Sequence, residues 1–89
     1  MKVVQTGSFR RKAKNLHATE KTALDRAVRK LVASPESGAS QKGDLAGVRV
    51  LKFKVKAQQY LLAYSYEPEL ITLLAIGTHE NFYRDIGKQ

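Results

Sequence analysis

The chain has no cysteine and no tryptophan, and it carries only 8 acidic residues against 16 lysines and arginines. Without cysteine, disulfides and thiolate metal sites are excluded. No apolar run is long enough to span a membrane and no signal-peptide pattern is visible, so we expect a cytoplasmic protein. A length of 89 residues allows one small hydrophobic core, which predicts a single domain over residues 1–89.

Positive charge is concentrated at the beginning of the chain. Residues 1–34 hold nine lysines and arginines but only two acids, so they account for +7 of the net charge of +8. A basic surface of this kind predicts attraction to nucleic acid, to the ribosome or to an acidic protein partner. A solvated basic helix face in an ordinary soluble domain is the alternative, and charge alone does not decide between them. The candidate phosphate contacts in this region are Arg10, Arg11, Lys12 and Lys14.

The first half of the chain predicts one strand and two helices. Residues 1–6 are typical of a short strand, and Ser8 is expected to cap a short basic helix. A second helix is expected over residues 19–34, capped by Thr19 and stopped by the following proline. His17 is expected at the C-terminus of the first helix, where an imidazolium interacts favourably with the helix dipole. Residues 35–47 contain three glycines and predict a loop.

The second half of the chain predicts three strands joined by hairpin turns. The strands are expected over residues 48–56, 60–66 and 70–78, and the turns over residues 57–59 and 67–69. The resulting order is β-α-α-β-β-β, followed by a short C-terminal helix. We therefore expect an α+β fold in which a small antiparallel sheet packs on an N-terminal helical hairpin.

Lysines alternate with apolar residues in the first of these strands. The pleat predicts that Lys52, Lys54 and Lys56 lie on one face, while the apolar residues between them face the helices. A half-buried strand needs a polar outer face, which is the plain structural explanation for lysines here. The functional explanation is that this strand contains no acid to neutralise them, so the face suits a phosphate group.

A histidine and a tyrosine follow the last expected strand at a spacing of four residues. If this segment forms a helical turn, His79 and Tyr83 lie on the same side of it. The structural alternatives are that His79 only hydrogen-bonds a loop carbonyl and that Tyr83 only packs its ring in the core. The alternating Tyr60, Tyr64 and Tyr66 are expected to serve core packing.

Several segments together resemble a known family. These are residues 43–47 (GDLAG), 52–54 (KFK), 60–64 (YLLAY) and 77–83 (GTHENFY), in this order and within the predicted element order. The chain is similar over essentially its whole length to the RelE/ParE superfamily of bacterial type II toxins. The resemblance implies a toxin that is neutralised by a cotranscribed, acidic antitoxin. In the RelE branch it further implies an endoribonuclease, or mRNA interferase, that acts on messenger RNA in the ribosome. Such an enzyme would use attack by the ribose 2′-hydroxyl and would need no metal or other cofactor.

The resemblance also implies roles for particular residues. Lys52 and Lys54 would stabilise the pentacoordinate phosphate and protonate the leaving oxygen, and His79 would act as base or acid. Tyr83 would stack on a base or orient the phosphate. Additional phosphate contacts are expected from Lys56 and Arg84.

The sequence departs from the RelE pattern at one position and leaves two other functions open. RelE-like enzymes carry an arginine on the next strand where this chain has Leu61, and Lys56 is a better substitute than Arg49, which lies on the opposite pleat. One alternative is a ParE-like inhibitor of DNA gyrase that cleaves no RNA. A nontoxic basic binding domain is another.

Overall fold

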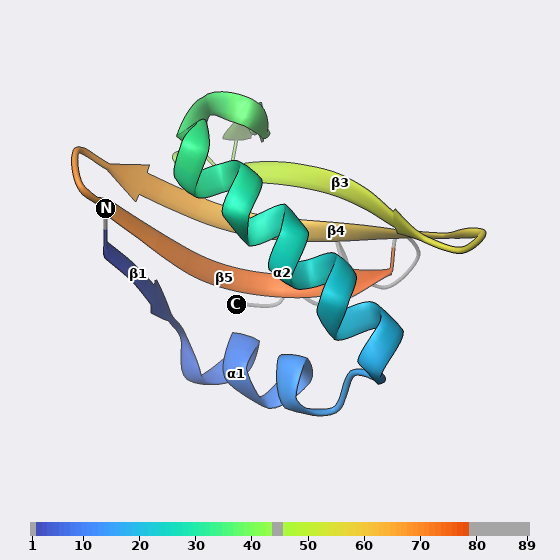
Figure 1. Cartoon of the computed structure of the whole chain (residues 1–89). Coiled ribbons are helices and arrows are strands. Elements are labelled where there is room, and N and C mark those ends of the chain that lie inside the picture. The colour runs from blue at the N-terminus through green and yellow to red at the C-terminus, as the bar shows by residue number, and fades with distance from the viewer. Residues whose placement is uncertain (1, 44–45, 79–89) are drawn as a thin grey trace.

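The computed structural model describes residues 2–43 and 46–78 of the chain. The elements in order are β1 (Lys2–Gln5), α1 (Gly7–Lys14), α2 (Ala18–Ala33), the 3-10 helix η1 (Pro35–Ser37), β2 (Ala39–Ser40), β3 (Arg49–Val55), β4 (Gln58–Glu67) and β5 (Leu70–Thr78). Their arrangement is shown in Figure 1. The short C-terminal helix expected from the sequence lies outside the described residues.

The strands form one five-stranded sheet in the order β1-β5-β4-β3-β2. Strand β2 pairs with β3, β3 with β4 and β4 with β5, all antiparallel, whereas β1 is parallel to β5. The α+β fold is therefore confirmed, with a mixed sheet in place of a purely antiparallel one. The parallel pair arises because the chain leaves β1, passes through both helices and three further strands, and returns beside it. The two-residue strand β2 lies in the segment expected to be a loop.

Both helices begin at different residues from those predicted. Thr6, not Ser8, caps α1, because the Thr6 side-chain oxygen accepts a hydrogen bond from the backbone nitrogen of Phe9 at 3.1 Å. His17 precedes α2 as its N-cap, and its backbone N–H donates to the Glu20 carboxylate at 2.8 Å. The prediction that His17 ends the first helix is therefore wrong, and His17 lies at the positive end of a helix dipole.

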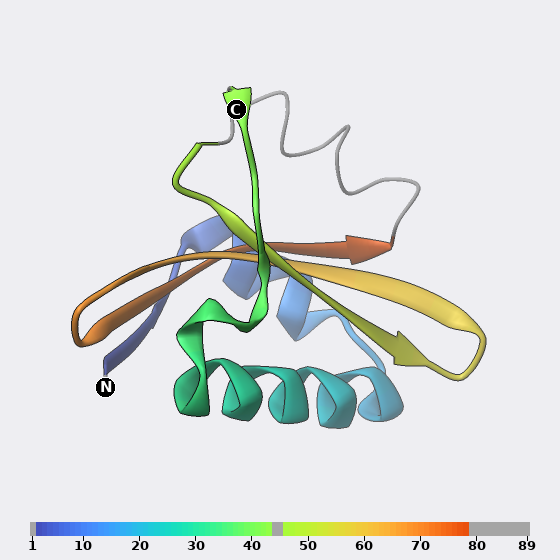
Figure 2. The same ribbon diagram turned by 90° about the horizontal axis from the view of Figure 1, so that it is seen from above.

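The main core lies between the sheet and α2, which covers one face of it in Figures 1 and 2. Leu31 from α2, Leu62 from β4 and Phe9 from α1 belong to this core, and the first two have no exposed surface. As predicted, Leu51 and Phe53 of β3 face the helices. We call the opposite side of the sheet the second face.

A β-bulge in β5 distributes the apolar residues 73–76 over both faces of the sheet. Ala63 pairs with Ala75 and Tyr64 with Leu73, so Leu74 is the extra residue. Leu73 belongs to the helix-side core, whereas Leu74 and Ala75 pack in a cluster on the second face. The Thr6 hydroxyl donates to the carbonyl of Leu74 at 3.1 Å, which ties the start of α1 to the bulge.

Tyr64 joins β4 to the segment after α2. Its ring is completely buried, its hydroxyl donates to the Pro35 carbonyl at 2.6 Å, and it accepts from the Gly38 N–H at 2.8 Å. Burial raises the pKa of this hydroxyl, which therefore stays protonated. The expected core role is confirmed for Tyr64 but is wrong for Tyr66, which is 38% exposed.

Candidate phosphate-binding site on strand β3

The second face of the sheet presents two cations from β3. Lys52 and Lys54 are both exposed, and their side chains share one side of the strand because they are two residues apart. Among the described residues, neither ammonium group is paired with a carboxylate. The prediction is therefore confirmed for Lys52 and Lys54, and these two charges can meet an anion from solvent.

Lys56 does not continue this lysine face. The strand ends at Val55, which pairs with Gln58, so Lys56 and Ala57 form a two-residue hairpin turn. Lys56 has a φ of 57°, and it borders a hollow on the α2 side of the sheet. The alternation that predicted it beside Lys52 and Lys54 stops one residue earlier.

Leu61 lies directly across from Lys52 in the register of β3 and β4. It has no exposed surface and packs with Val50 and Ala63 in the apolar cluster of the second face. The position where the resemblance expected an arginine therefore holds an apolar side chain beside the two lysines, and no cation of β4 takes its place.

Arg49 is committed to other contacts. Its Nη1 donates to the carbonyls of Gly38 at 2.8 Å and Glu36 at 3.2 Å, and its guanidinium lies 5.3 Å from the centre of the Tyr66 ring. These contacts hold the segment before β2 against the sheet. Arg49 is thus a structural cation, in agreement with the expectation that it is the poorer substitute at the site.

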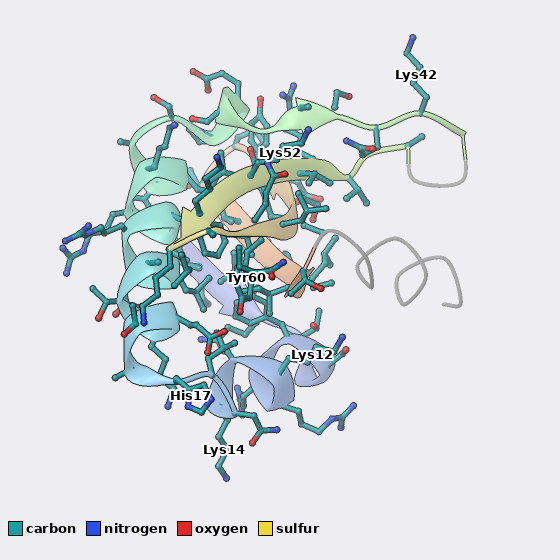
Figure 3. The ribbon with its side chains drawn as sticks, turned by 90° about the vertical axis from the view of Figure 1, so that its right-hand side faces the viewer. Lys12, Lys14, His17, Lys42, Lys52 and Tyr60 are labelled. Carbon is teal, nitrogen blue, oxygen red and sulfur yellow. The ribbon has the colours of Figure 1, made fainter. Side chains whose placement is uncertain are left out.

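The basic residues of α1 form a separate surface. Arg10, Arg11, Lys12 and Lys14 are all exposed. Lys12 and Lys14 lie well away from Lys52 in Figure 3, and Lys42 lies apart from both groups. The structure therefore does not bring the α1 cations together with the lysines of β3, and any shared ligand has to be long enough to reach both.

His79, Tyr83 and Arg84 lie outside the described residues, so their expected roles remain predictions. The structure does define the point at which the chain reaches His79. Thr78, the last residue of β5, pairs with Tyr60, and Tyr60 pairs with Phe53, the residue between Lys52 and Lys54. Strand β5 thus ends level with the two lysines, at two strand spacings or about 10 Å from β3.

The polar contact of Tyr60 was not expected from the sequence. The Tyr60 hydroxyl donates to the Glu20 carboxylate of α2, and its ring stacks on Phe53 with 5.7 Å between the ring centres. The hydrogen bond from Tyr60 lowers the pKa of Glu20, and the same bond raises the pKa of Tyr60. With His17, this pair borders a hollow of about 480 Å³.

The partners Glu20 and Tyr60 are 40 residues apart, so no local pattern could have paired them. At neutral pH the pair is a carboxylate bound to a phenol, which anchors the start of α2 to β4. It adds negative charge on the α2 side of the sheet and none on the second face.

No cluster of three or more histidine, cysteine or acidic side chains is placed to hold a metal ion within residues 2–43 and 46–78. In the same part of the chain, neither helix has the length and apolar character required to cross a membrane.

The chain matches the sequence profile of one protein family. The sequence profile of the "ParE-like toxin of type II bacterial toxin-antitoxin system" family matches residues 3–87. No functionally curated protein matches the chain in sequence.

Three solved structures share the fold at low sequence identity. A chain of the intact RelBE toxin-antitoxin complex of E. coli superimposes with a TM-score of 0.69 and 17% identity, over 85% of this chain and 93% of that one. The YoeB/ParE toxin of Agrobacterium tumefaciens gives 0.67 and 20%, over 89% and 99%. A conserved hypothetical protein of Helicobacter pylori gives 0.57 and 19%, over 90% and 96%.

Proposed function

The chain belongs to the ParE-like toxins of type II bacterial toxin-antitoxin systems, within the RelE/ParE superfamily, and we propose that it arrests growth by cutting messenger RNA on the ribosome. The cleavage needs no metal ion. A cotranscribed acidic antitoxin neutralises the toxin in the cytoplasm, and a single domain over residues 1–89 carries the activity. The superimposed chain from the RelBE complex supports a protein antitoxin as partner.

The observation that carries this proposal is the pair of exposed lysines on the second face. Lys52 and Lys54 lie on one side of β3 without a carboxylate partner among the described residues. The end of β5 is level with them, and His79 is the next residue of the chain. A cationic surface combined with an imidazole would suit the cleavage of a phosphodiester.

The proposed reaction is an internal displacement at phosphorus. The ribose 2′-oxygen attacks the adjacent phosphorus while the bond to the 5′-oxygen breaks, which leaves a cyclic phosphate and a free 5′-hydroxyl. His79 takes the 2′-hydroxyl proton, and a lysine ammonium donates a proton to the 5′-oxygen. Lys52 and Lys54 stabilise the charge that develops on the phosphate oxygens. Tyr83 stacks on a base, and Lys56 and Arg84 contact flanking phosphates.

Inhibition of DNA gyrase without RNA cleavage is the second candidate. Leu61 favours it, because a buried apolar side chain stands across from Lys52 where a third cation would strengthen a nuclease site. The family profile that matches residues 3–87 is also named for ParE-like toxins. A gyrase inhibitor needs a binding surface and no catalytic group.

The deciding experiment is inducible expression of wild type, His79→Ala and Lys52→Ala/Lys54→Ala, with primer extension on a reporter messenger RNA. We expect growth arrest with in-frame cuts in the wild type. In each variant the yield of cuts should fall by about 100-fold or more, as when one charge-stabilising group is removed from an active site.

Lys42→Ala is the matched control, because Lys42 is an exposed lysine far from Lys52 (Figure 3). It should cut like the wild type at equal protein level. Arrest without cuts that persists in every variant and induces the DNA damage response would move the assignment to gyrase. Absence of arrest would remove both toxin mechanisms.

A further inference from the structure

The outer edge of β1 is unpaired. Strand β1 stands first in the sheet order, and within residues 2–43 and 46–78 its sole strand neighbour is β5. Figure 1 shows β1 at the margin of the sheet, with α1 continuing from it beside β5. An open strand edge is a template for pairing with another strand. The segment Lys2–Gln5 therefore offers such a template on the side of the sheet away from β3.

Hydrogen bonds to β5 identify which backbone groups of β1 point outward. The Lys2 N–H donates to the Glu69 carbonyl at 2.9 Å, and the Thr6 N–H also donates to β5, at 3.1 Å. Backbone groups two residues apart in a strand face the same edge. Because Lys2 and Thr6 face β5, Val3 and Gln5 direct their N–H and C=O groups to the open side.

Two copies of β1 can pair antiparallel about a twofold axis at Val4. Val3 of one copy then lies opposite Gln5 of the other, and the two residues of each such pair exchange both of their backbone hydrogen bonds. The half-buried Val4 side chains of the two copies meet at the axis, where an antiparallel ladder brings opposite residues closest. This register uses every outward-facing backbone group of β1 in both copies.

Charge complementarity favours a second copy as the occupant of this edge. Glu67 and Glu69 flank the turn between β4 and β5, and both are exposed. With Lys2 and Val4 they border a hollow of about 510 Å³ beside β1. In the paired register, Lys2 lies opposite Thr6 of the second copy. The α1 helix of the second copy therefore begins next to this acidic turn.

The first half of α1 carries the charge that complements the acidic turn. Arg10 and Arg11 are exposed, and the first turn of α1 contains no acid. The added β1 lies two strand spacings, or about 10 Å, from β5, which is within the range of attraction between charges at physiological salt. Twofold symmetry makes the contact twice. A strand rich in carboxylates would instead meet Glu67 and Glu69 with like charge.

We propose that the free toxin forms a weak twofold dimer in which β1 pairs with β1 of a second copy. The two sheets join into one, with β3 and β2 of each copy toward its outer ends, so Lys52 and Lys54 stay open in both copies. The paired strands are short and bury less area than a stable dimer needs, so we expect a Kd on the order of 10–100 µM. The inference goes beyond the proposed function and holds for either toxin mechanism.

Sedimentation equilibrium and amide hydrogen exchange of the full chain, purified free of the antitoxin, test the dimer. The average mass should rise from that of one chain, 9.9 kDa, toward twice this value between about 5 and 500 µM. Over the same range, exchange at the Val3 and Gln5 amides should slow by about three- to tenfold, whereas exchange at Val4, which faces β5, should not depend on concentration. The mass of one chain at every concentration overturns the proposal. Protection of Val3 and Gln5 that is independent of concentration, or that needs the antitoxin, also overturns it.

Two variants at Gln5 test the backbone pairing. Gln5→Pro removes the outward N–H, while Gln5→Ala removes the same side chain and keeps the N–H. Proline is tolerated at an edge position whose N–H faces outward. Each substitution occurs twice in the dimer, so Gln5→Pro should raise the Kd by about tenfold or more relative to Gln5→Ala. Equal dissociation constants overturn the backbone pairing.

Glu67→Lys tests the acidic turn without altering β1, and Glu36→Lys is its matched control. Glu36 is an exposed acid of η1, which leads into β2 at the opposite edge of the sheet. Glu67→Lys should raise the Kd by about five- to tenfold more than Glu36→Lys, and equal effects overturn the charge assignment. Growth arrest and RNA cleavage are measured separately, so a failed nuclease assay does not affect the dimer result.

Discussion

The two faces of the sheet bury different amounts of apolar surface. On the α2 side, Leu31, Leu62 and Tyr64 have no exposed surface and belong to one core cluster. On the second face, the buried cluster consists of Val50, Leu61 and Ala63. Lys52 and Lys54 stand exposed beside that small cluster. The helix-side core therefore supplies most of the stability, and β3 can carry two charges that have no carboxylate partner among the described residues.

Truncation of the helix-side core should have the largest effect on stability. Leu62→Ala removes a fully buried side chain from the core and should lower the free energy of unfolding by about 2–5 kcal/mol. Chemical denaturation followed by circular dichroism measures it. The comparison between faces breaks down if Lys52→Ala destabilises the protein as much as Leu62→Ala does.

A methyl group at Gly38 should destabilise the protein through its contact with the buried Tyr64 ring. An added Cβ would lie 2.7 Å from Tyr64 Cε1 and from its hydroxyl oxygen. Because the Tyr64 ring is buried and hydrogen-bonded on both sides, Gly38→Ala should cost about 1–3 kcal/mol. Gly7→Ala is the control, since nothing lies within 4 Å of its added Cβ. Equal denaturation midpoints for the two variants would show that the Tyr64 contact is adaptable.

Removal of the Tyr60 hydroxyl should change the titration of Glu20. The pKa of Glu20 is lowered chiefly by the hydrogen bond from Tyr60, so its contribution to stability is present above the ordinary carboxyl pKa and is lost as pH falls through the lowered value. In Tyr60→Phe the pKa of Glu20 should rise toward its ordinary value, and this acid-side loss should shrink.

The contribution of Tyr60 to stability should have the opposite dependence on pH. Because the hydrogen bond to Glu20 raises its pKa, its contribution is present below about pH 10 and is lost as pH rises through the raised value. NMR titration of the Glu20 carboxyl carbon in wild type and Tyr60→Phe measures the first effect. An identical titration in both proteins would mean that the hydroxyl does not bind Glu20 in solution.

The smallest expected change in stability comes from the second face. Lys52→Ala and Lys54→Ala remove exposed side chains without a described partner, and each should change the free energy of unfolding by less than about 0.5 kcal/mol. Thermal and chemical unfolding of each variant check this. A stable variant that no longer cuts RNA would show that the second face serves function and the helix-side core serves stability. A large loss of stability would instead assign the lysines a structural role.

Much of the fold could be predicted from local sequence signals. The apolar run that follows the Glu67-Pro68-Glu69 turn signal predicted β5 at residues 70–78, as found. The alternation of lysines with apolar residues placed Lys52 and Lys54 on the exposed side of β3. Periodicity and turn residues are local properties, and these elements depend on them.

The features that were missed depend on distant residues. The two residues of β2 form a strand only because β3 lies beside them, and the bulge at Leu74 is set by pairing with β4. Lys56 was assigned to the lysine face because the hairpin turn was expected one residue later. The contact between Tyr60 and Glu20 joins elements 40 residues apart, beyond the reach of any pattern within one segment.

Because β1 pairs with β5, the sheet of this toxin can be completed only after its last strand has been synthesised. Thr6 bonds to Leu74 across 68 residues, and β1 has β5 as its neighbour in the sheet. During translation, β1 is made first and stays unpaired until β5 has left the ribosome, because this non-local contact closes last. A nascent chain therefore lacks its finished sheet while it is still being made.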